Sequence, residues 1–212
     1  VRLVRRAEAT PTAGATSPTP VPTRALARRF WAFAWPRSFA GVFALTILWV
    51  DTLIVGGVAG SDQAAVYVAA VRWLIVGNLA ANAVSQAFGP EIARVLAVGG
   101  AGRARRLFQE SAALLALLAV PAYLTAIVFA PFLLTAFGDG YDDGSAVIAI
   151  TGVGFVLAAI AGPVDTLLVM AGRTRQSLAN TGVALAVNVV ANVVLVPAWG
   201  IAGAALAWTL TL

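Results

Sequence analysis

Two charged side chains, Asp51 and Arg72, lie inside long apolar stretches of this 212-residue chain. Asp51 comes about six residues before the end of one stretch and Arg72 about eight residues into the next, so on neighbouring helices they would reach similar depths of ~9 and ~12 Å. A lone charge in the middle of a bilayer costs ~2.5–3.5 kcal/mol on insertion scales, so the spacing predicts an ion pair or a shared water-filled cavity. The pair could have the purely structural role of holding two helices together, or it could line a transport pathway.

Side-chain amides follow Arg72 along the same apolar stretch. Asn78, Asn82 and Gln86, together with Ser85, fall within an arc of roughly 140° that includes Arg72 when each residue turns a helix by 100°. This arrangement predicts one polar helix face, which we interpret as the lining of a substrate cavity.

A second pair of amides accompanies Asp51. Asn188 and Asn192 are one helical turn apart, at a depth of ~6–12 Å that matches Asp51. Carboxylate and amide oxygens are ligands for hard cations, so these three side chains could hold a small cation. Hydrogen bonding between helices is the alternative interpretation, because amides commonly join helices in lipid.

The remaining residue types exclude most enzyme chemistry. The chain has no cysteine, histidine or lysine, which excludes the common zinc sites, thiol nucleophiles, Ser-His-Asp triads and a lysine-containing phosphate-binding loop. Asp139, Asp142 and Asp143 form one acidic cluster that could hold magnesium in a membrane-embedded glycosyl- or prenyl-phosphate transferase. A solvated turn is the preferred interpretation, because the segment is rich in glycine and has no second acidic motif. We therefore expect neither an enzyme nor a bound cofactor.

The elements that position these residues are membrane helices. Hydrophobic residues make up 60% of the chain and charged residues 11%, and the mean hydropathy is +0.90, which is too apolar for a water-soluble globule of this size. The net charge of +5 does not indicate nucleic acid, because the basic residues flank apolar segments. We predict an all-α, polytopic transmembrane helical bundle in the lipid bilayer, with six membrane helices at residues 39–57, 64–88, 111–137, 145–171, 178–196 and 199 onward.

The arginines set the expected orientation, because they fall in every second loop. The positive-inside rule places the N-terminal segment and these loops in the cytoplasm of a multi-pass membrane protein. The bacterial plasma (inner) membrane as its location is what the family resemblance described below implies. Asp165, after a Gly162–Pro163 break, is expected either to pair with Arg173 or Arg175 or to contact substrate.

The chain is expected to divide into two parts. Residues 1–29 are interpreted as a cytoplasmic, disordered linker, because their Pro/Thr/Ala-rich stretch cannot bury a core. Residues 30–212 are interpreted as a six-helix transmembrane lobe. The last apolar run has 14 residues, whereas a span needs ~20, so we expect the last helix to be truncated and the chain to be a piece of a longer protein.

The order of motifs resembles the C-terminal half of a lipid-linked oligosaccharide flippase of the MOP (multidrug/oligosaccharidyl-lipid/polysaccharide) superfamily. The resemblance covers about residues 39–212. It rests on WVDTLIVGG (49–57), AAVYVAAVRW (64–73), FGPEIARVLAVGGAGRARRLF (88–108), APFLLTAFGDGYDDG (130–144), GPVDTLLVMAGRTRQSLAN (162–180) and NVVANVVLVPAWGIAGAALAW (188–208).

The resemblance implies one lobe of a two-lobe transporter, with the missing N-terminal six-helix lobe as its partner. Such proteins move an undecaprenyl-diphosphate-linked oligosaccharide, either a polysaccharide or O-antigen unit or a peptidoglycan precursor, across the plasma membrane by alternating access. Arg72 is the basic residue positioned to meet the anionic diphosphate of this lipid-linked glycan. Asp51, Asn188 and Asn192 are the matching candidates for a site that binds a coupling ion, Na⁺ or H⁺.

Two other functions compete with the flippase at this stage. A cation-coupled multidrug antiporter of the same superfamily shares the fold, but it would favour acidic cavity residues, and Arg72 argues mildly against it. The transferase belongs to a different class and depends on the acidic cluster described above.

Overall fold

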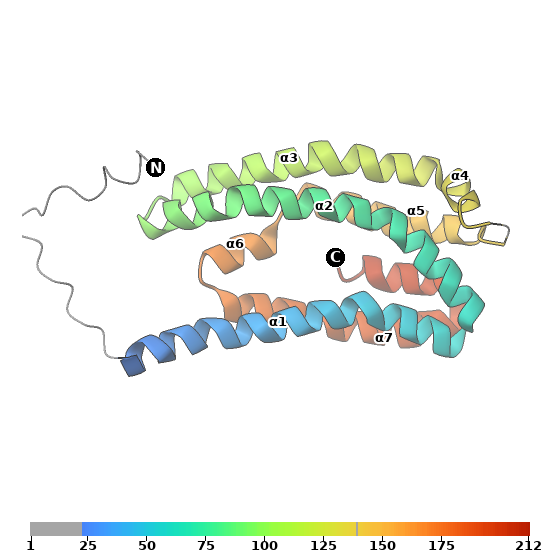
Figure 1. Cartoon of the computed structure of the whole chain (residues 1–212), viewed down its shortest axis with the longest axis horizontal. Helices are drawn as coiled ribbons and strands as arrows, with labels where there is room; N and C mark the ends of the chain where they lie inside the picture. Colours follow the sequence, from blue (N-terminus) through green and yellow to red (C-terminus); the bar gives the residue numbers. More distant parts are fainter. Residues whose placement is uncertain (1–22, 139) are drawn as a thin grey trace, which may run out of the picture. The chain divides into compact units, whose positions relative to one another are not determined.

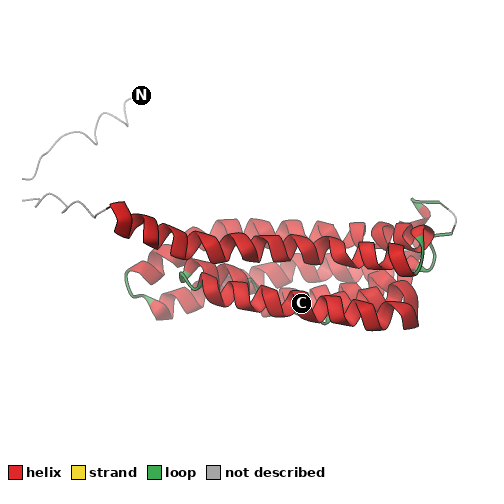
Figure 2. Ribbon diagram, turned by 90° about the horizontal axis from the view of Figure 1, so that it is seen from below, coloured by secondary structure: helices red, strands yellow, loops and turns green. Residues whose placement is uncertain are grey.

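The structure is a computed structural model, and it describes residues 23–138 and 140–212. The described chain is helical, without strands. Its elements are α1 (Thr23–Val58), α2 (Ser61–Ala97), α3 (Ala101–Val128), α4 (Ala130–Thr135), α5 (Gly144–Ala161), α6 (Val164–Met170) and α7 (Thr174–Thr209), and in residues 33–212 the long helices run alongside one another (Figures 1 and 2). Residues 1–22, most of the expected linker, and Asp139 lie outside the described residues.

Within the described residues, five helices are long and apolar enough to cross a membrane: α1, α2, α3, α5 and α7. α7 contains a break at Gly200, where φ is 57° and ψ is −136°, a conformation that glycine adopts at little cost. This break falls at the boundary predicted between the fifth and sixth apolar segments, and the chain turns back after it (Figure 1). The predicted all-α polytopic helical bundle is therefore confirmed.

Two of the predicted spans are divided in the structure. The third breaks at Phe129 into α3 and α4, and Pro131 lies at the start of α4, where its missing N–H does not cost a helical hydrogen bond. The fourth breaks at Gly162, with φ of 82°, and Pro163, which separate α5 from α6. A Cβ at Gly162 would also collide with Ala112, so this break depends on glycine.

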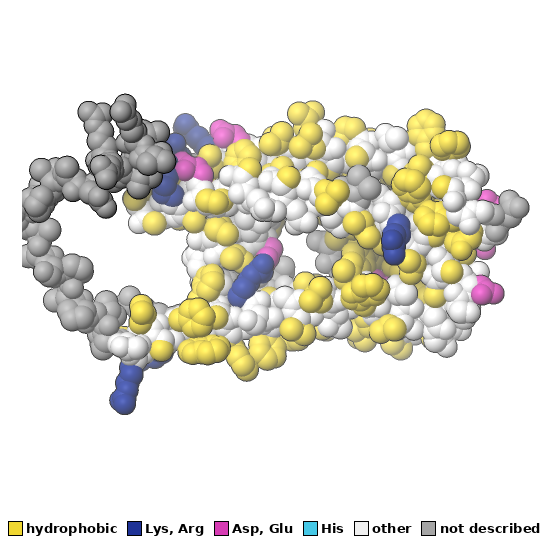
Figure 3. Space-filling model, in the orientation of Figure 1, with side chains coloured by type: hydrophobic (Ala, Val, Ile, Leu, Met, Phe, Trp, Pro, Cys, Tyr) yellow, Lys and Arg dark blue, Asp and Glu magenta, His cyan; other side chains and the backbone are white. Residues whose placement is uncertain are grey.

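The core of residues 33–212 lies among α2, α3 and α5. The ring of Tyr123 stacks on that of Phe155 with centroids 5.2 Å apart, and it covers Gly77 so closely that a Cβ there would collide with the ring. Large apolar side chains also cover much of the outside (Figure 3), among them Leu53 and Phe132, each 72% exposed. Such a surface is stable against lipid, whereas a water-soluble protein rarely exposes apolar patches of this extent.

The start of α1, residues 23–32, forms a unit of its own. Phe30 and Trp31 are each 61% exposed, and their rings meet edge to face at 5.5 Å. Arg24 and Arg28 are exposed on the same short segment. Aromatic and basic residues in this mixture are typical of the headgroup layer of a membrane.

Candidate functional site

Asp51 is the centre of a buried polar cluster that joins three helices. It lies on α1 and is 1% exposed. Asn192 of α7 donates from Nδ2 to Asp51 Oδ1 at 2.5 Å, and Tyr67 of α2 donates its hydroxyl to Oδ2 at 3.3 Å. Asn188 lies one turn from Asn192, whose Nδ2 also donates to the Asn188 carbonyl oxygen at 2.9 Å. The structure thus brings together the three side chains predicted as an ion site.

Tyr67 was missed at the sequence level. Asp51 lies nine residues before Gly60 and Tyr67 seven residues after it, where α1 turns into α2. Similar distances from a tight helical turn place two residues at similar depths, so the position of the turn was the signal that could have identified Tyr67.

Several polar atoms of this cluster have no hydrogen-bond partner in the described part of the chain. They are Asn188 Oδ1 and Nδ2 and Asn192 Oδ1, all buried. A buried polar atom without a partner costs about 1–3 kcal/mol, and such atoms in a native protein call for an explanation, such as a water or an ion. The two amide oxygens and the two carboxylate oxygens of Asp51 make four oxygen atoms, which is chemistry suited to a hard cation.

Arg72 lies apart from Asp51. The described residues contain no carboxylate within 4 Å of its guanidinium, and Asp51 lines none of the described cavities. The predicted ion pair of Asp51 and Arg72 is therefore wrong. The reason is helical geometry: Tyr67 and Arg72 are five residues apart on α2 and point about 140° from each other, so only Tyr67 reaches Asp51.

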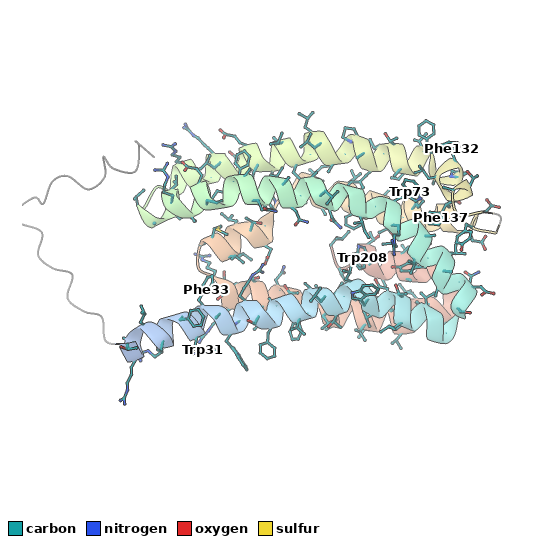
Figure 4. All side chains as sticks on the ribbon, viewed as in Figure 1. Trp31, Phe33, Trp73, Phe132, Phe137 and Trp208 are labelled. Atoms are coloured by element: carbon teal, nitrogen blue, oxygen red, sulfur yellow. The ribbon has the colours of Figure 1, made fainter. Side chains whose placement is uncertain are left out.

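The exposed Arg72 side chain lines two adjoining grooves between α1 and α2, and Thr52 also contributes to both. One groove, of about 310 Å³, has aromatic walls that include Trp49, Tyr67 and Trp208. The other, of about 560 Å³, is lined by further residues of α2 and of the loop after α4. The face between α1 and α2 is hollowed (Figure 3), and Trp208 lies beside the hollow (Figure 4).

The amides of α2 line different cavities from Arg72. Asn78, Asn82 and Ser85 line a cavity of about 370 Å³ beside the break between α5 and α6. Asn82, Ser85 and Gln86 line a neighbouring one of about 400 Å³. The predicted polar face of α2 is thus divided, with the amides in cavities that Arg72 does not line. Fourteen residues of helix from Arg72 to Gln86 rise by ~21 Å, so one angular face extends over very different depths.

Asp165 is held by residues other than those expected. Its Oδ2 accepts from Arg37 of α1 at 3.3 Å, and the hydroxyl of Ser177 on α7 donates to its Oδ1. The predicted pairing with Arg173 or Arg175 is therefore wrong. Gly172, with φ of 72°, reverses the chain after α6, so the first turn of α7 places Ser177 beside Asp165 and leaves both of those arginines exposed.

The loop acids form a turn at the far end of the bundle. Asp142 and Asp143 are exposed, and the carbonyl oxygen of Asp142 accepts from the backbone and the hydroxyl of Ser145 at 3.0 and 2.7 Å. In residues 23–138 and 140–212 no three acidic, histidine or cysteine side chains are grouped so that they could hold a metal. We call the end of the bundle with Arg37, Arg94 and Arg103 the arginine-rich end, and the end with Asp142 and Asp143 the opposite end.

The five apolar helices, with exposed apolar side chains over their outer surface, indicate a multi-pass membrane protein. The model of the MatE family matches residues 36–194, about three quarters of the chain. The chain belongs to the MatE family, within the MOP superfamily, whose members are transporters. No curated protein and no solved structure matches it.

Proposed function

We propose that the chain forms one lobe of a flippase that moves an undecaprenyl-diphosphate-linked oligosaccharide across the bacterial plasma membrane by alternating access. The observation that carries the proposal is Arg72, an exposed guanidinium in an apolar groove with no carboxylate beside it in the described residues. A charge in such a place is costly without a partner. An anionic substrate supplies that partner during transport.

The groove suits a diphosphate joined to a long apolar chain. A guanidinium binds phosphate oxygens through two parallel hydrogen bonds, and the aromatic side chains of Trp49 and Trp208 flank Arg72. Trp49 is 63% exposed, so the groove is open at its α1 side. In the proposed mechanism the head group binds Arg72 while the prenyl tail stays in lipid, and no covalent step is required.

The buried cluster supplies the proposed coupling site. Asp51 and the free amide oxygens of Asn188 and Asn192 would hold Na⁺, or Asp51 would take a proton, when the transporter changes conformation. Tyr67 connects the two sites, because its hydroxyl binds Asp51 and its ring lines the groove of Arg72. A change in the charge state of Asp51 therefore acts directly on a wall of the groove.

The proposed orientation follows the arginines. The arginine-rich end carries Arg94, Arg103, Arg105 and Arg106 around the turn between α2 and α3, and all four are exposed. The positive-inside rule assigns that end to the cytoplasm. The substrate would then meet the amide-lined cavities first and Arg72, nearer the opposite end, later.

Substitutions at Arg72 test the proposal in cells that display the glycan. Arg72→Glu should abolish surface display and leave the lipid-linked unit in the inner leaflet, because a carboxylate repels the diphosphate. Arg72→Lys, the matched control, keeps the charge and should retain part of the display. Loss of Asp142 and Asp143 to alanine should leave display intact.

Two other results would each select a competing function. If the Asp142→Ala/Asp143→Ala variant stopped synthesis of the lipid-linked unit while Arg72→Glu had no effect, a transferase would replace the flippase. If Arg72→Glu instead increased export of a cationic drug and left the glycan unchanged, the multidrug antiporter would replace it.

A further inference from the structure

The ion pair of Arg37 and Asp165 lies where it can contribute little to the stability of the fold. Its side chains are 49% and 52% exposed, and exposed ion pairs contribute only about 0–1 kcal/mol to stability. Both residues also line the cavity of about 400 Å³ at the arginine-rich end. The pair is therefore weak, open to solvent and directed into a cavity.

The two partners differ in their freedom to move. Arg37 belongs to the 36-residue helix α1, whereas Asp165 belongs to α6, a helix of seven residues with no buried side chain. Glycines at positive φ flank α6 on both sides, Gly162 at 82° and Gly172 at 72°. If the pair separates, the carboxylate is the partner that moves away, and the guanidinium stays in the cavity.

Free hydrogen-bond donors surround the guanidinium. The amides of Asn82 and Gln86 line the same cavity, and neither forms a side-chain hydrogen bond within the described residues. The hydroxyl of Thr166 in α6 donates to Ser85 of α2 at 3.0 Å. Ser85 accepts in that bond, so its own hydroxyl can still donate into the cavity. An arginine, two unengaged amides and this hydroxyl form a set of donors suited to phosphate oxygens.

We propose that Arg37 and Asp165 form an exchangeable docking site at the arginine-rich end, in which a phosphate or diphosphate group displaces the Asp165 carboxylate from Arg37. The inference rests on the proposed function and adds a second binding site for the phosphate head group. Thr52, which lines the groove of Arg72, is fifteen residues from Arg37 on α1. The two binding sites are therefore ~22 Å apart along α1. A head group docked at Arg37 would next meet Arg72.

Opposite effects of the two partners distinguish this exchange from a structural lock. The full-length protein in nanodiscs is titrated with undecaprenyl diphosphate, with undecaprenol as the probe that lacks phosphate. Arg37→Gln should weaken diphosphate binding about tenfold, because a charge-assisted contact is lost. Asp165→Asn should tighten it about two- to fivefold, because a competing half-exposed carboxylate is removed.

Two matched controls test whether the effects depend on these positions. Glu91 of α2 pairs with Arg94 and Arg103 at the same end, and so serves as a matched acidic residue. Arg173→Gln and Glu91→Gln make the same charge changes without altering the pair of Arg37 and Asp165, and each should change affinity less than twofold. Weaker or unchanged binding by Asp165→Asn would overturn the inference, as would equal tightening by Glu91→Gln. Inorganic pyrophosphate should give the same opposite effects with lower affinity. Undecaprenol should bind the two variants and the unsubstituted protein equally well. If Arg37→Gln weakened and Asp165→Asn tightened the binding of undecaprenol, the inference would also be overturned.

A measurement on the unsubstituted protein covers the case in which a variant does not fold. Undecaprenyl diphosphate should increase hydrogen exchange of the α6 backbone, because Asp165 is released, and undecaprenol should not. Unchanged or slower exchange in α6 would overturn the inference. If Arg72→Gln loses diphosphate binding while Asp165→Asn changes nothing, the proposed function stands and the docking site fails. If the protein does not distinguish the diphosphate from undecaprenol, the proposed function itself fails.

Discussion

The hydrogen bond from Asn192 to Asp51 provides a test of the buried cluster that does not depend on the substrate. In a double-mutant cycle, Asp51→Ala strands the Asn192 amide and Asn192→Ala strands the Asp51 carboxylate, whereas the double variant removes both groups. The double variant should therefore lose less free energy of unfolding than the sum of the losses in the two single variants.

The structure sets the size of this coupling. Hydrogen bonds between membrane helices contribute about 0.6 kcal/mol on average and up to about 1.7 kcal/mol in double-mutant cycles. The bond of 2.5 Å to a carboxylate that is 1% exposed belongs at the upper end, because a charged acceptor strengthens it and no solvent screens it. We expect about 1–2 kcal/mol of coupling.

The assay is unfolding of the purified protein by titration with SDS in mixed micelles. The comparison cycle pairs Asp51→Ala with Arg72→Ala, which lines the groove instead of the cluster, and should give a smaller coupling, below about 0.5 kcal/mol. A coupling of 1–2 kcal/mol in the Arg72 cycle, with additive effects in the Asn192 cycle, would refute the arrangement of the two sites.

Three further predictions concern topology, packing and the cation. A cysteine at Asp142 should react with a membrane-impermeant label from outside intact cells and one at Gly102 should not; the reverse pattern would invert the orientation. Gly203→Ala should lower the free energy of unfolding by about 1–3 kcal/mol, because its Cβ collides with the carbonyl of Leu195, whereas Gly41→Ala has free space around it and should change little; equal effects would refute the packing of α7. Na⁺ should raise the melting temperature of the protein and Asp51→Asn should remove that shift; a shift that persists in the variant would place the cation elsewhere.

Much of the fold follows from the sequence because hydropathy reports burial in lipid directly. Runs of apolar residues with polar loops predict the spanning helices, and the Pro197–Gly200 segment predicts the break inside α7. The division of the third and fourth spans was harder to predict. Pro121 continues within α3, while the chain breaks at Phe129 ahead of Pro131, so a proline in an apolar run does not by itself locate a break.

The candidate site was predictable where depth alone decides contact. Asp51, Asn188 and Asn192 share a depth, and the structure joins them. The partner of Arg72 could not be predicted in the same way, because contact also depends on the direction in which each side chain leaves its helix, and that direction is fixed only when the helices pack. Asp165 shows the same limit: Arg37, its partner, is 128 residues away in sequence.

The most direct test of the proposed function is transport by the purified full-length protein in proteoliposomes. A fluorescent undecaprenyl-diphosphate-linked sugar is placed in both leaflets, and a membrane-impermeant quencher reports the fraction that reaches the outer leaflet. The flippase predicts that quenching becomes complete with the unsubstituted protein and stays at about half with Arg72→Glu, while Asp142→Ala/Asp143→Ala behaves like the unsubstituted protein. Quenching that stays at half with the unsubstituted protein, together with proton- or Na⁺-driven uptake of ethidium into the same vesicles, would contradict the flippase and establish the drug antiporter.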